Sequence, residues 1–272
     1  MKYLHHIKRM LISILRYLII AYISLILFAV FFTKPLLYPR HPSSYRDTPA
    51  IIKIKTQDQH VISAHYLKTQ KKPEVILLYS HGNAGDLGWL NHYLKQFVSH
   101  GFSVFAYDYS GYGTSTGTPT EHTTYHDIEA AYRYMTQTLK IKPGHIIAYG
   151  RSLGSGPTLE LAQHHRLGGI IIEGGFVNAF QVITHVPLLP FSPYQNIKKI
   201  KHIKRPILII HAIQDQVIPF WHGQALYDAA PWPKYKLWLE NAGHNTLLRT
   251  QNKTYWRALK EFVQTIKHKH IM

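Results

Sequence analysis

The pentapeptide Gly150-Arg-Ser-Leu-Gly154 places Ser152 between two glycines, each two residues away. This spacing fits the G-x-S-x-G turn between a strand and a helix, which holds a serine in a strained conformation and exposes its hydroxyl at the end of a sheet. Glycine is needed on both sides because a Cβ there would clash with the neighbouring strand and helix. Glycine and serine are common, so a plain glycine-rich turn explains the pattern equally well.

A serine hydroxyl is a useful nucleophile only when a base removes its proton, and histidine is the suitable base near neutral pH. The second nitrogen of that histidine needs a carboxylate, which sets the tautomer and stabilises the imidazolium. Asp215 and His244 follow Ser152 in the order Ser, Asp, His that elbow-type hydrolases use, and both follow predicted strands. The alternatives are a turn aspartate and a solvent-exposed histidine, the latter because the chain contains 20 histidines.

Acyl transfer also needs two N–H donors for the oxyanion of the tetrahedral intermediate. Leu153, the residue after the serine, offers one backbone N–H. Asn83, in the loop His81-Gly-Asn83, offers the other, and Gly82 and Gly85 let this backbone approach a substrate. A turn rich in glycine and asparagine is the alternative interpretation.

Short apolar runs alternate with helical patterns along the chain, which predicts an α/β fold with a mostly parallel sheet and helices on both faces. Two early strands separated by a polar turn predict an antiparallel hairpin at the sheet edge. Ligands of such sheets bind at the carboxyl ends of the strands, where the candidate residues lie. The expected strands are residues 51–55, 61–67, 75–79, 102–109, 145–152, 169–173, 206–213 and 236–239, and the expected helices are 88–100, 121–139, 157–165 and 255–266.

Several stretches in order, covering the chain from about Leu36 to Ile266, resemble the alpha/beta-hydrolase superfamily. They are most similar to its Bem46-like branch, which includes the membrane-anchored alpha/beta-hydrolase domain proteins 12, 13 and 17. The stretches are Leu36-Leu-Tyr-Pro39, Ser80-His-Gly-Asn-Ala-Gly-Asp86, Tyr107-Asp-Tyr-Ser-Gly-Tyr-Gly113, Tyr149-Gly-Arg-Ser-Leu-Gly154, Ile210-His-Ala-Ile-Gln-Asp215 and Gly243-His-Asn245.

The resemblance implies an alpha/beta-hydrolase fold and assigns roles to the candidate residues. Ser152 is then the nucleophile, Asp215 the acid and His244 the base, and Asn83 and Leu153 are the oxyanion donors. The chain departs from the family at two positions: Ser110 stands where arginine is usual, and Ala212 stands where glycine is usual. Neither position touches the chemistry directly. The first bears on a salt bridge or the rim of the pocket, and so on substrate shape more than on catalysis.

The N-terminal region predicts a membrane anchor. Residues 10–32 are strongly apolar with a single charge, Arg16, and are long enough to span a bilayer. Lys2, Lys8 and Arg9 precede the apolar run, so the positive-inside tendency puts the N-terminus in the cytosol and the rest across the membrane, in the periplasm if the source is a Gram-negative bacterium. A cleaved signal peptide and a buried core helix are the alternatives. We expect an anchor at 1–32, a proline-rich linker or extended arm at 33–50 and a catalytic domain at 51–272.

The net charge of +17 favours an anionic partner, such as the headgroups of a membrane surface. No nucleic-acid-binding motif accompanies it, so we expect no nucleic-acid partner. The absence of cysteine excludes disulfides, a cysteine nucleophile and cysteine-based zinc sites. His122 and His126 have the helical i, i+4 spacing of metal ligands but lack the glutamate of a zinc-protease motif, and we expect neither a metal nor a cofactor.

The segment between the strands expected at 169–173 and 206–213 is too short for a folded lid domain, so we expect a minimal cap. Its apolar residues suggest either a rim that contacts acyl chains or a loop packed on the sheet. The basic run that follows suggests a solvated face or contact with lipid headgroups. The apolar residues are Phe180, Val186, Pro187, Leu188, Leu189, Pro190 and Phe191, and the basic ones are Lys198, Lys199, Lys201, Lys204 and Arg205.

Together these features predict a membrane-anchored serine hydrolase that cleaves a carboxylic ester or thioester of a small molecule or lipid through an acyl-enzyme. A peptidase of the same fold and a non-catalytic, membrane-attached binding protein are the alternatives.

Overall fold

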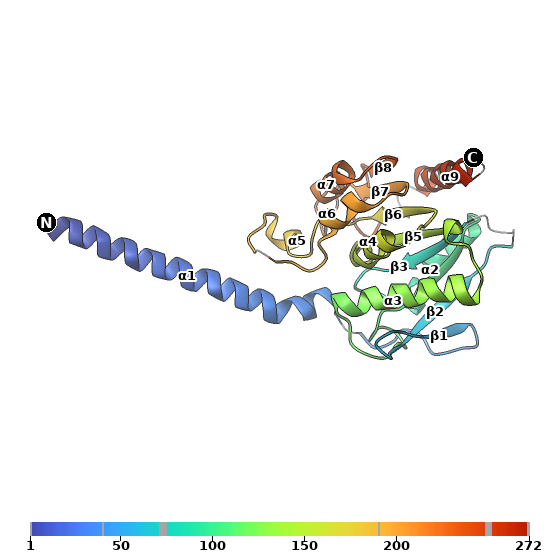
Figure 1. Ribbon diagram of the computed structural model, residues 1–272, viewed down its shortest axis with the longest axis horizontal. Helices are drawn as coiled ribbons and strands as arrows, with labels where there is room; N and C mark the ends of the chain where they lie inside the picture. Colours follow the sequence, from blue (N-terminus) through green and yellow to red (C-terminus); the bar gives the residue numbers. More distant parts are fainter. Residues whose placement is uncertain (1, 40, 71–74, 190, 248–251, 271–272) are drawn as a thin grey trace. The chain divides into compact units, whose positions relative to one another are not determined.

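The computed structural model describes residues 2–39, 41–70, 75–189, 191–247 and 252–270, in two compact units, Met1–Pro39 and Arg40–Met272 (Figure 1). Pro190, one of the apolar cap residues expected from the sequence, lies outside the described residues.

The first unit is a single helix, α1 (Lys2–Leu37). The stretch His5–Ala29 has a mean hydropathy of 2.3 and is long and apolar enough to cross a membrane. Residues 33–37, expected to begin a linker, continue the helix. A proline is tolerated there because Pro35 removes only one backbone donor near the helix end, and the following Tyr38 N–H still reaches the Lys34 carbonyl at 3.0 Å.

The second unit is built on an eight-stranded sheet in the order β1-β2-β4-β3-β5-β6-β7-β8. The β1–β2 and β2–β4 pairs are antiparallel, and the other neighbours are parallel. The prediction of a mostly parallel sheet with an antiparallel N-terminal hairpin is therefore confirmed. The strands are β1 (Ile51–Lys55), β2 (Val61–Leu67), β3 (Ile76–Ser80), β4 (Ser103–Tyr107), β5 (Ile146–Arg151), β6 (Gly169–Glu173), β7 (Ile207–Ala212) and β8 (Lys234–Leu239).

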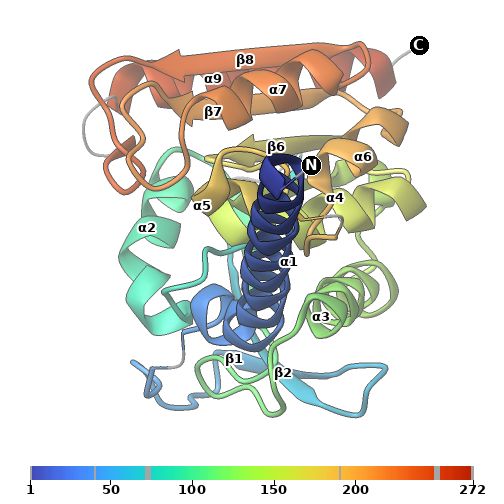
Figure 2. The ribbon, with the colours of Figure 1, turned by 90° about the vertical axis from the view of Figure 1, so that its left-hand side faces the viewer.

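Helices cover both faces of this sheet because the central strands are apolar on both sides. One face packs against α2 (Leu87–Ser99) and α9 (Asn252–His270), whose apolar stripes join residues such as Tyr149 and Ile171 in one core. The other carries α3 (Glu121–Arg133), α4 (Ser155–His164), α6 (Asn196–Lys199) and α7 (Trp221–Ala229), which contact one another in that order (Figure 2). The helix expected at 121–139 changes at Tyr134 into a π-helical turn, Tyr134–Thr138.

The segment between β6 and β7 holds two four-residue helices, α5 (Gln181–Thr184) and α6, and one 3₁₀ turn, Ile200–His202. Ile183 is 66% exposed, and Val186, Leu188 and Phe191 are also exposed, so these side chains do not pack on the sheet. We call these four residues the apolar flap.

The basic run after the flap does not form one solvated face. Lys198, Lys201 and Lys204 are exposed. Lys199 instead forms an ion pair with Glu160 at 2.6 Å and is only 12% exposed.

Residues 41–50, the remainder of the expected linker, contain no helix or strand, yet part of this arm is hydrogen-bonded to the rest of the second unit. The Ser44 N–H donates to Asp86 at 2.7 Å, and the Tyr45 hydroxyl donates to Asp108 at 2.6 Å. Asp86 also caps α2 by accepting from the Trp89 N–H at 3.0 Å. The arm is thus part of the folded unit and contacts the loop after β3.

Candidate active site

Ser152 lies in the turn between β5 and α4 with a φ of +52°, in the left-handed region that non-glycine residues rarely adopt. The flanking glycines are sterically required. A Cβ on Gly150 would lie 2.4 Å from the Gly154 carbonyl oxygen, and one on Gly154 would lie 2.1 Å from the Ser80 carbonyl oxygen. The close approach of β3, β5 and α4 therefore explains the G-x-S-x-G spacing, and the strain at Ser152 is typical of functional sites.

The structure brings Ser152, His244 and Asp215 into one hydrogen-bonded chain. His244 Nε2 lies 3.1 Å from Ser152 Oγ, and His244 Nδ1 lies 2.7 Å from Asp215 Oδ2. His244 comes from the loop after β8 and Asp215 from the loop after β7, both at the carboxyl end of the sheet. With Nδ1 donating to the carboxylate, Nε2 is free to accept the serine proton.

The Asp215 carboxylate is held in its ionised form. Burial of Asp215 opposes its ionisation. The hydrogen bond and charge attraction from His244 outweigh burial, and the Ile218 N–H also donates to the carboxylate at 2.7 Å, so the pKa of Asp215 stays below its usual value. The N–H of Val217 donates to the same oxygen at 2.9 Å. His211, whose Nε2 lies 2.9 Å from the Ile218 carbonyl oxygen, supports this loop, and burial lowers the pKa of His211. Asp215 is therefore prepared to orient His244 and stabilise its imidazolium.

The loop after β3, which holds Asn83, passes directly beside Ser152. A Cβ on Gly82 would lie 3.4 Å from the Ser152 Cβ. Two tyrosines hold the loop: the Tyr109 hydroxyl donates to the His81 carbonyl at 2.7 Å, and the Tyr112 hydroxyl donates to the Asn83 carbonyl at 3.0 Å. The candidate donors Asn83 and Leu153 thus belong to the two backbone segments that flank the serine hydroxyl.

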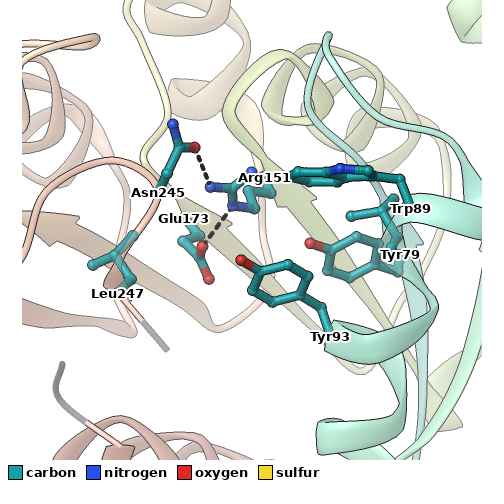
Figure 3. Close-up of a pocket in the computed structure, with 8 residues that line it drawn as sticks. Tyr79, Trp89, Tyr93, Arg151, Glu173, Asn245 and Leu247 are labelled. Atoms are coloured by element: carbon teal, nitrogen blue, oxygen red, sulfur yellow. Dashed lines mark hydrogen bonds and ion pairs between the residues drawn. The ribbon is translucent and has the colours of Figure 1, made fainter. Parts of the chain in front are cut away.

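Arg151, the first of the two x positions in the pentapeptide, holds the loop that carries His244, a role that the sequence analysis missed. Its guanidinium donates to the His244 carbonyl at 2.9 Å, to Asn245 at 3.0 Å and to Glu173 at 3.0 Å. Figure 3 shows Arg151 between Asn245 and Glu173 on one side and Trp89 on the other. The cavity among these residues holds only about 20 Å³, room for about one water, so it is not a substrate pocket.

Glu173, the last residue of β6, connects Arg151 with the C-terminal helix. The hydroxyl of Tyr255, on α9, donates to Glu173 at 2.6 Å, and the buried Tyr149 hydroxyl bonds to the same carboxylate. Burial disfavours the charge on Arg151, but Glu173 outweighs that effect and the pKa of Arg151 stays above its usual value. A single acidic residue at the carboxyl end of the otherwise apolar run Gly169–Glu173 is the signal that would have identified Glu173 from the sequence.

Gly174 is a third residue that sequence reasoning missed. It has a φ of +55°, and a Cβ there would lie 3.1 Å from His244 Cε1 and 3.8 Å from Asp215 Oδ2. Glycine is therefore required both by the backbone conformation and by the approach of the imidazole.

A larger cavity of about 240 Å³ adjoins the loop after β3. It is lined on one side by Ala84 and Gly85, next to Asn83, and on another by His41, Pro42 and Ser44 of the N-terminal arm. Asp86, Trp89, Gly111, Tyr112 and Gly113 also line it.

Neither departure from the family pattern is a member of the hydrogen-bonded chain of Ser152, His244 and Asp215. Ser110 is buried and donates to both carboxylate oxygens of Asp127, from its N–H and its hydroxyl, each at 2.7 Å. Burial raises the pKa of Asp127 to about 7. Ser110 therefore belongs to a buried polar contact and not to a pocket rim. Ala212 is buried at the end of β7, immediately before the loop that carries Asp215.

A sheet of this order, with a strained serine in the turn after β5 and with acid and histidine loops after β7 and β8, defines an alpha/beta-hydrolase. Comparison with known proteins agrees. A family model described as serine aminopeptidase, S33, matches residues 71–189. An esterase from Pyrococcus furiosus has the same fold, with a TM-score of 0.70 at 17% identity over 85% of this chain and 97% of the esterase.

The chain belongs to the alpha/beta hydrolase domain-containing protein family and is similar to its protein 17 members. Human alpha/beta hydrolase domain-containing protein 17B is 35% identical over 228 residues, which cover 82% of this chain and 78% of the human protein. Protein 17C of Xenopus laevis is 34% identical over 221 residues, covering 80% of this chain and 70% of the relative.

Proposed function

We propose that this protein is a membrane-anchored serine hydrolase that cleaves a carboxylic ester or thioester of an acyl or lipid substrate. The observation that carries the proposal is the continuous hydrogen-bonded chain from Ser152 Oγ through His244 to Asp215. A binding protein that had lost catalytic activity would not need to retain both these hydrogen bonds and the strained backbone of Ser152.

In the proposed reaction, Ser152 Oγ attacks the substrate carbonyl carbon while His244 Nε2 takes the hydroxyl proton. The N–H groups of Asn83 and Leu153 donate to the oxyanion that forms. The intermediate collapses as His244 returns the proton to the departing alkoxide or thiolate, which leaves an acyl-serine. Water then attacks the acyl carbon with His244 as base, and the carboxylic acid departs as Ser152 regains its proton.

Two features favour an apolar acyl substrate at a membrane. The apolar flap exposes four large apolar side chains in one short segment, as expected of a surface that meets lipid or an acyl chain. The N-terminal stretch His5–Ala29 supplies the anchor, with the N-terminus in the cytosol and the hydrolase unit on the opposite side. The cavity of about 240 Å³ beside Ala84 and Gly85 offers space next to the proposed oxyanion loop.

The test combines fluorophosphonate labelling with hydrolysis of a series of acyl esters and acyl thioesters of increasing chain length. We expect Ser152→Ala to abolish labelling and to lower kcat on the order of 10³-fold or more, while the protein stays folded. Ser99→Ala, at the exposed end of α2, is the matched control and should label normally. Labelling that survives in Ser152→Ala would refute the proposal.

A peptidase of the same fold is the second candidate, because the matching family model is described as a serine aminopeptidase. An aminopeptidase needs a carboxylate to bind the substrate's α-ammonium group. Three buried carboxylates close to the site are already engaged, Glu173 by Arg151, Asp108 by Tyr45 and Asp86 by Ser44, which favours the ester substrate. Faster cleavage of aminoacyl amides than of acyl esters in the same series would reverse this preference.

A further inference from the structure

We propose that Asp58, His122 and His126 form a binding site for a divalent transition-metal ion such as Zn²⁺. The sequence analysis set this histidine pair aside because it lacks the glutamate of a zinc-protease motif, but the fold supplies a carboxylate from another part of the chain. Asp58 lies in the turn between β1 and β2, more than 60 residues earlier in the chain. Its Oδ2 lies 2.7 Å from His126 Nδ1 and 4.0 Å from His122 Nδ1, and ligand atoms of all three residues lie within 4.8 Å of one another.

Two well-defined elements hold the three side chains. Figure 1 shows α3 running beside the β1–β2 hairpin. The first turn of α3 is fixed by a capping box in which the Thr120 side chain accepts from the Thr123 N–H at 3.0 Å. Because His122 and His126 are one turn apart on α3, they project from the same side of the helix, and their ring centroids lie 4.1 Å apart.

The hairpin turn that carries Asp58 is also hydrogen-bonded. The Thr56 N–H donates to the His60 carbonyl at 2.8 Å, and the Gln59 N–H donates to the Thr56 carbonyl at 3.1 Å, with Gln59 in the left-handed conformation. The carboxylate therefore comes from a closed turn whose ends are paired in the sheet through Lys55 and Val61.

The spacing of the ligand atoms suits a transition metal. A tetrahedral ion about 2.0–2.2 Å from each ligand atom separates those atoms by roughly 3.3 Å. The two distances to Asp58, 2.7 and 4.0 Å, lie on either side of this value, and no two ligand atoms are more than 4.8 Å apart, so a shift of the His122 ring toward Asp58 and His126 would close the set around an ion. His122 is free to make such an adjustment because its side chain is 73% exposed.

The chemistry of the ligands selects the class of ion. Two imidazoles and one carboxylate favour Zn²⁺, Co²⁺ or Ni²⁺ over Mg²⁺ and Ca²⁺, which prefer all-oxygen sites. Three protein ligands leave a coordination position for water. Bound metal would tie the β1–β2 hairpin to α3, and neither Ser152 nor His244 takes part, so the inference does not depend on the proposed hydrolase activity.

The experiment measures metal binding by the full chain, purified in detergent without a histidine tag. Co²⁺ is titrated and its visible absorption followed, and Zn²⁺ is then added to displace it. We expect saturable binding of Co²⁺ with displacement by Zn²⁺, and a rise of several degrees in Tm when Zn²⁺ is in large excess over its Kd.

His122→Ala, which alters an exposed side chain, and Asp58→Asn, which preserves side-chain shape, should each weaken binding by about tenfold or more and remove the Tm shift. His164→Ala is the matched control because His164 is also an exposed helical histidine with a carboxylate partner at i−4, Glu160. Equal binding by the His122→Ala, Asp58→Asn and His164→Ala proteins, or no saturable binding by the parent, would overturn the proposal.

Discussion

The imidazole of His244 is confined by three neighbours at the residue scale. Asp215 holds Nδ1, Ser152 lies at Nε2, and Gly174 faces Cε1. Each neighbour has a different chemical requirement: a charge, a hydroxyl and the absence of a side chain. Gly174 is the neighbour whose contribution is purely steric, so a substitution there tests how closely the proposed base must be placed.

Gly174→Ala should lower both stability and kcat. A side chain at a φ of +55° costs about 1–2 kcal/mol, and its Cβ would press on His244. We expect kcat to fall roughly 10- to 100-fold, because small displacements of catalytic groups are costly. Gly101→Ala is the control, since Gly101 has a φ of +94° with no atom within 4 Å of the added Cβ. Gly101→Ala should lower stability but leave kcat unchanged. An equal fall in kcat in Gly101→Ala and Gly174→Ala would contradict the steric explanation.

The raised pKa of Asp127 predicts that the stability of the protein depends on pH. Burial raises its pKa to about 7 in the folded protein, so the native state binds more protons than the unfolded state between about pH 4 and pH 7. The contribution of Asp127 to stability therefore falls as pH rises through this window. Asp127→Asn can still bond to Ser110, whose hydroxyl rotates to accept from the new amide.

The free energy of unfolding of Asp127→Asn minus that of the parent should be about 1–3 kcal/mol larger at pH 8 than at pH 5. Urea unfolding at the two pH values measures this change. Asp228→Asn, at an exposed position on α7, should show no such gain. A parent and Asp127→Asn variant with the same pH profile would show that Asp127 ionises normally.

At the scale of elements, the site depends on two strand ends and one distant helix. The last residue of β5, Arg151, and the last residue of β6, Glu173, form an ion pair that secures the loop after β8 through the His244 carbonyl. Tyr255 adds a bond from α9. The loop after β8, which carries His244, is thus held by backbone and side-chain contacts that do not involve the reacting atoms. Arg151 is therefore a positioning residue.

Arg151→Lys tests this positioning. Lysine keeps a positive charge for Glu173. Its single ammonium group cannot reproduce the planar guanidinium, which donates to Glu173, Asn245 and the His244 carbonyl at the same time. We expect kcat to fall about 10- to 100-fold with little change in KM, because the loop that carries His244 loses its anchor. Arg133→Lys at the exposed ion pair with Glu129 is the control and should leave both constants unchanged. A change confined to KM would instead place Arg151 in substrate binding.

At the scale of the whole molecule, the chain combines a lone apolar helix with a hydrolase unit that has its own core. The unit from Arg40 onward contains the complete sheet, the proposed triad and the arm that contacts the loop after β3. The helix α1 contributes none of the residues that carry the proposed chemistry.

Removing residues 1–39 should therefore separate anchoring from activity. We expect the full chain to stay with membranes in high salt and to be released only by detergent, because the proposed anchor is an apolar helix. The shortened protein should be soluble and should hydrolyse a short-chain, water-soluble ester with little change in kcat. Release of the full chain by high salt alone would show instead that the basic surface, with its net charge of +17, mediates attachment.

Local sequence patterns determined much of this protein. The strands Ile51–Lys55, Val61–Leu67 and Gly169–Glu173 have the predicted bounds, because apolar runs and turn residues report backbone preference and burial directly. The order of Ser152, Asp215 and His244 at strand ends was also readable, since parallel strands bring their carboxyl ends to one edge.

Only the tertiary structure decided which distant side chains meet. Asp58 reaches His126 because the hairpin pairs with β4 and lies against α3, and Arg151 reaches the His244 carbonyl across 93 residues because β5, β6, β7 and β8 are successive neighbours. No local pattern encodes strand order or the direction of a side chain across a sheet. The need for glycine at position 174 likewise follows from the imidazole that packs against it, which is 70 residues away in the sequence.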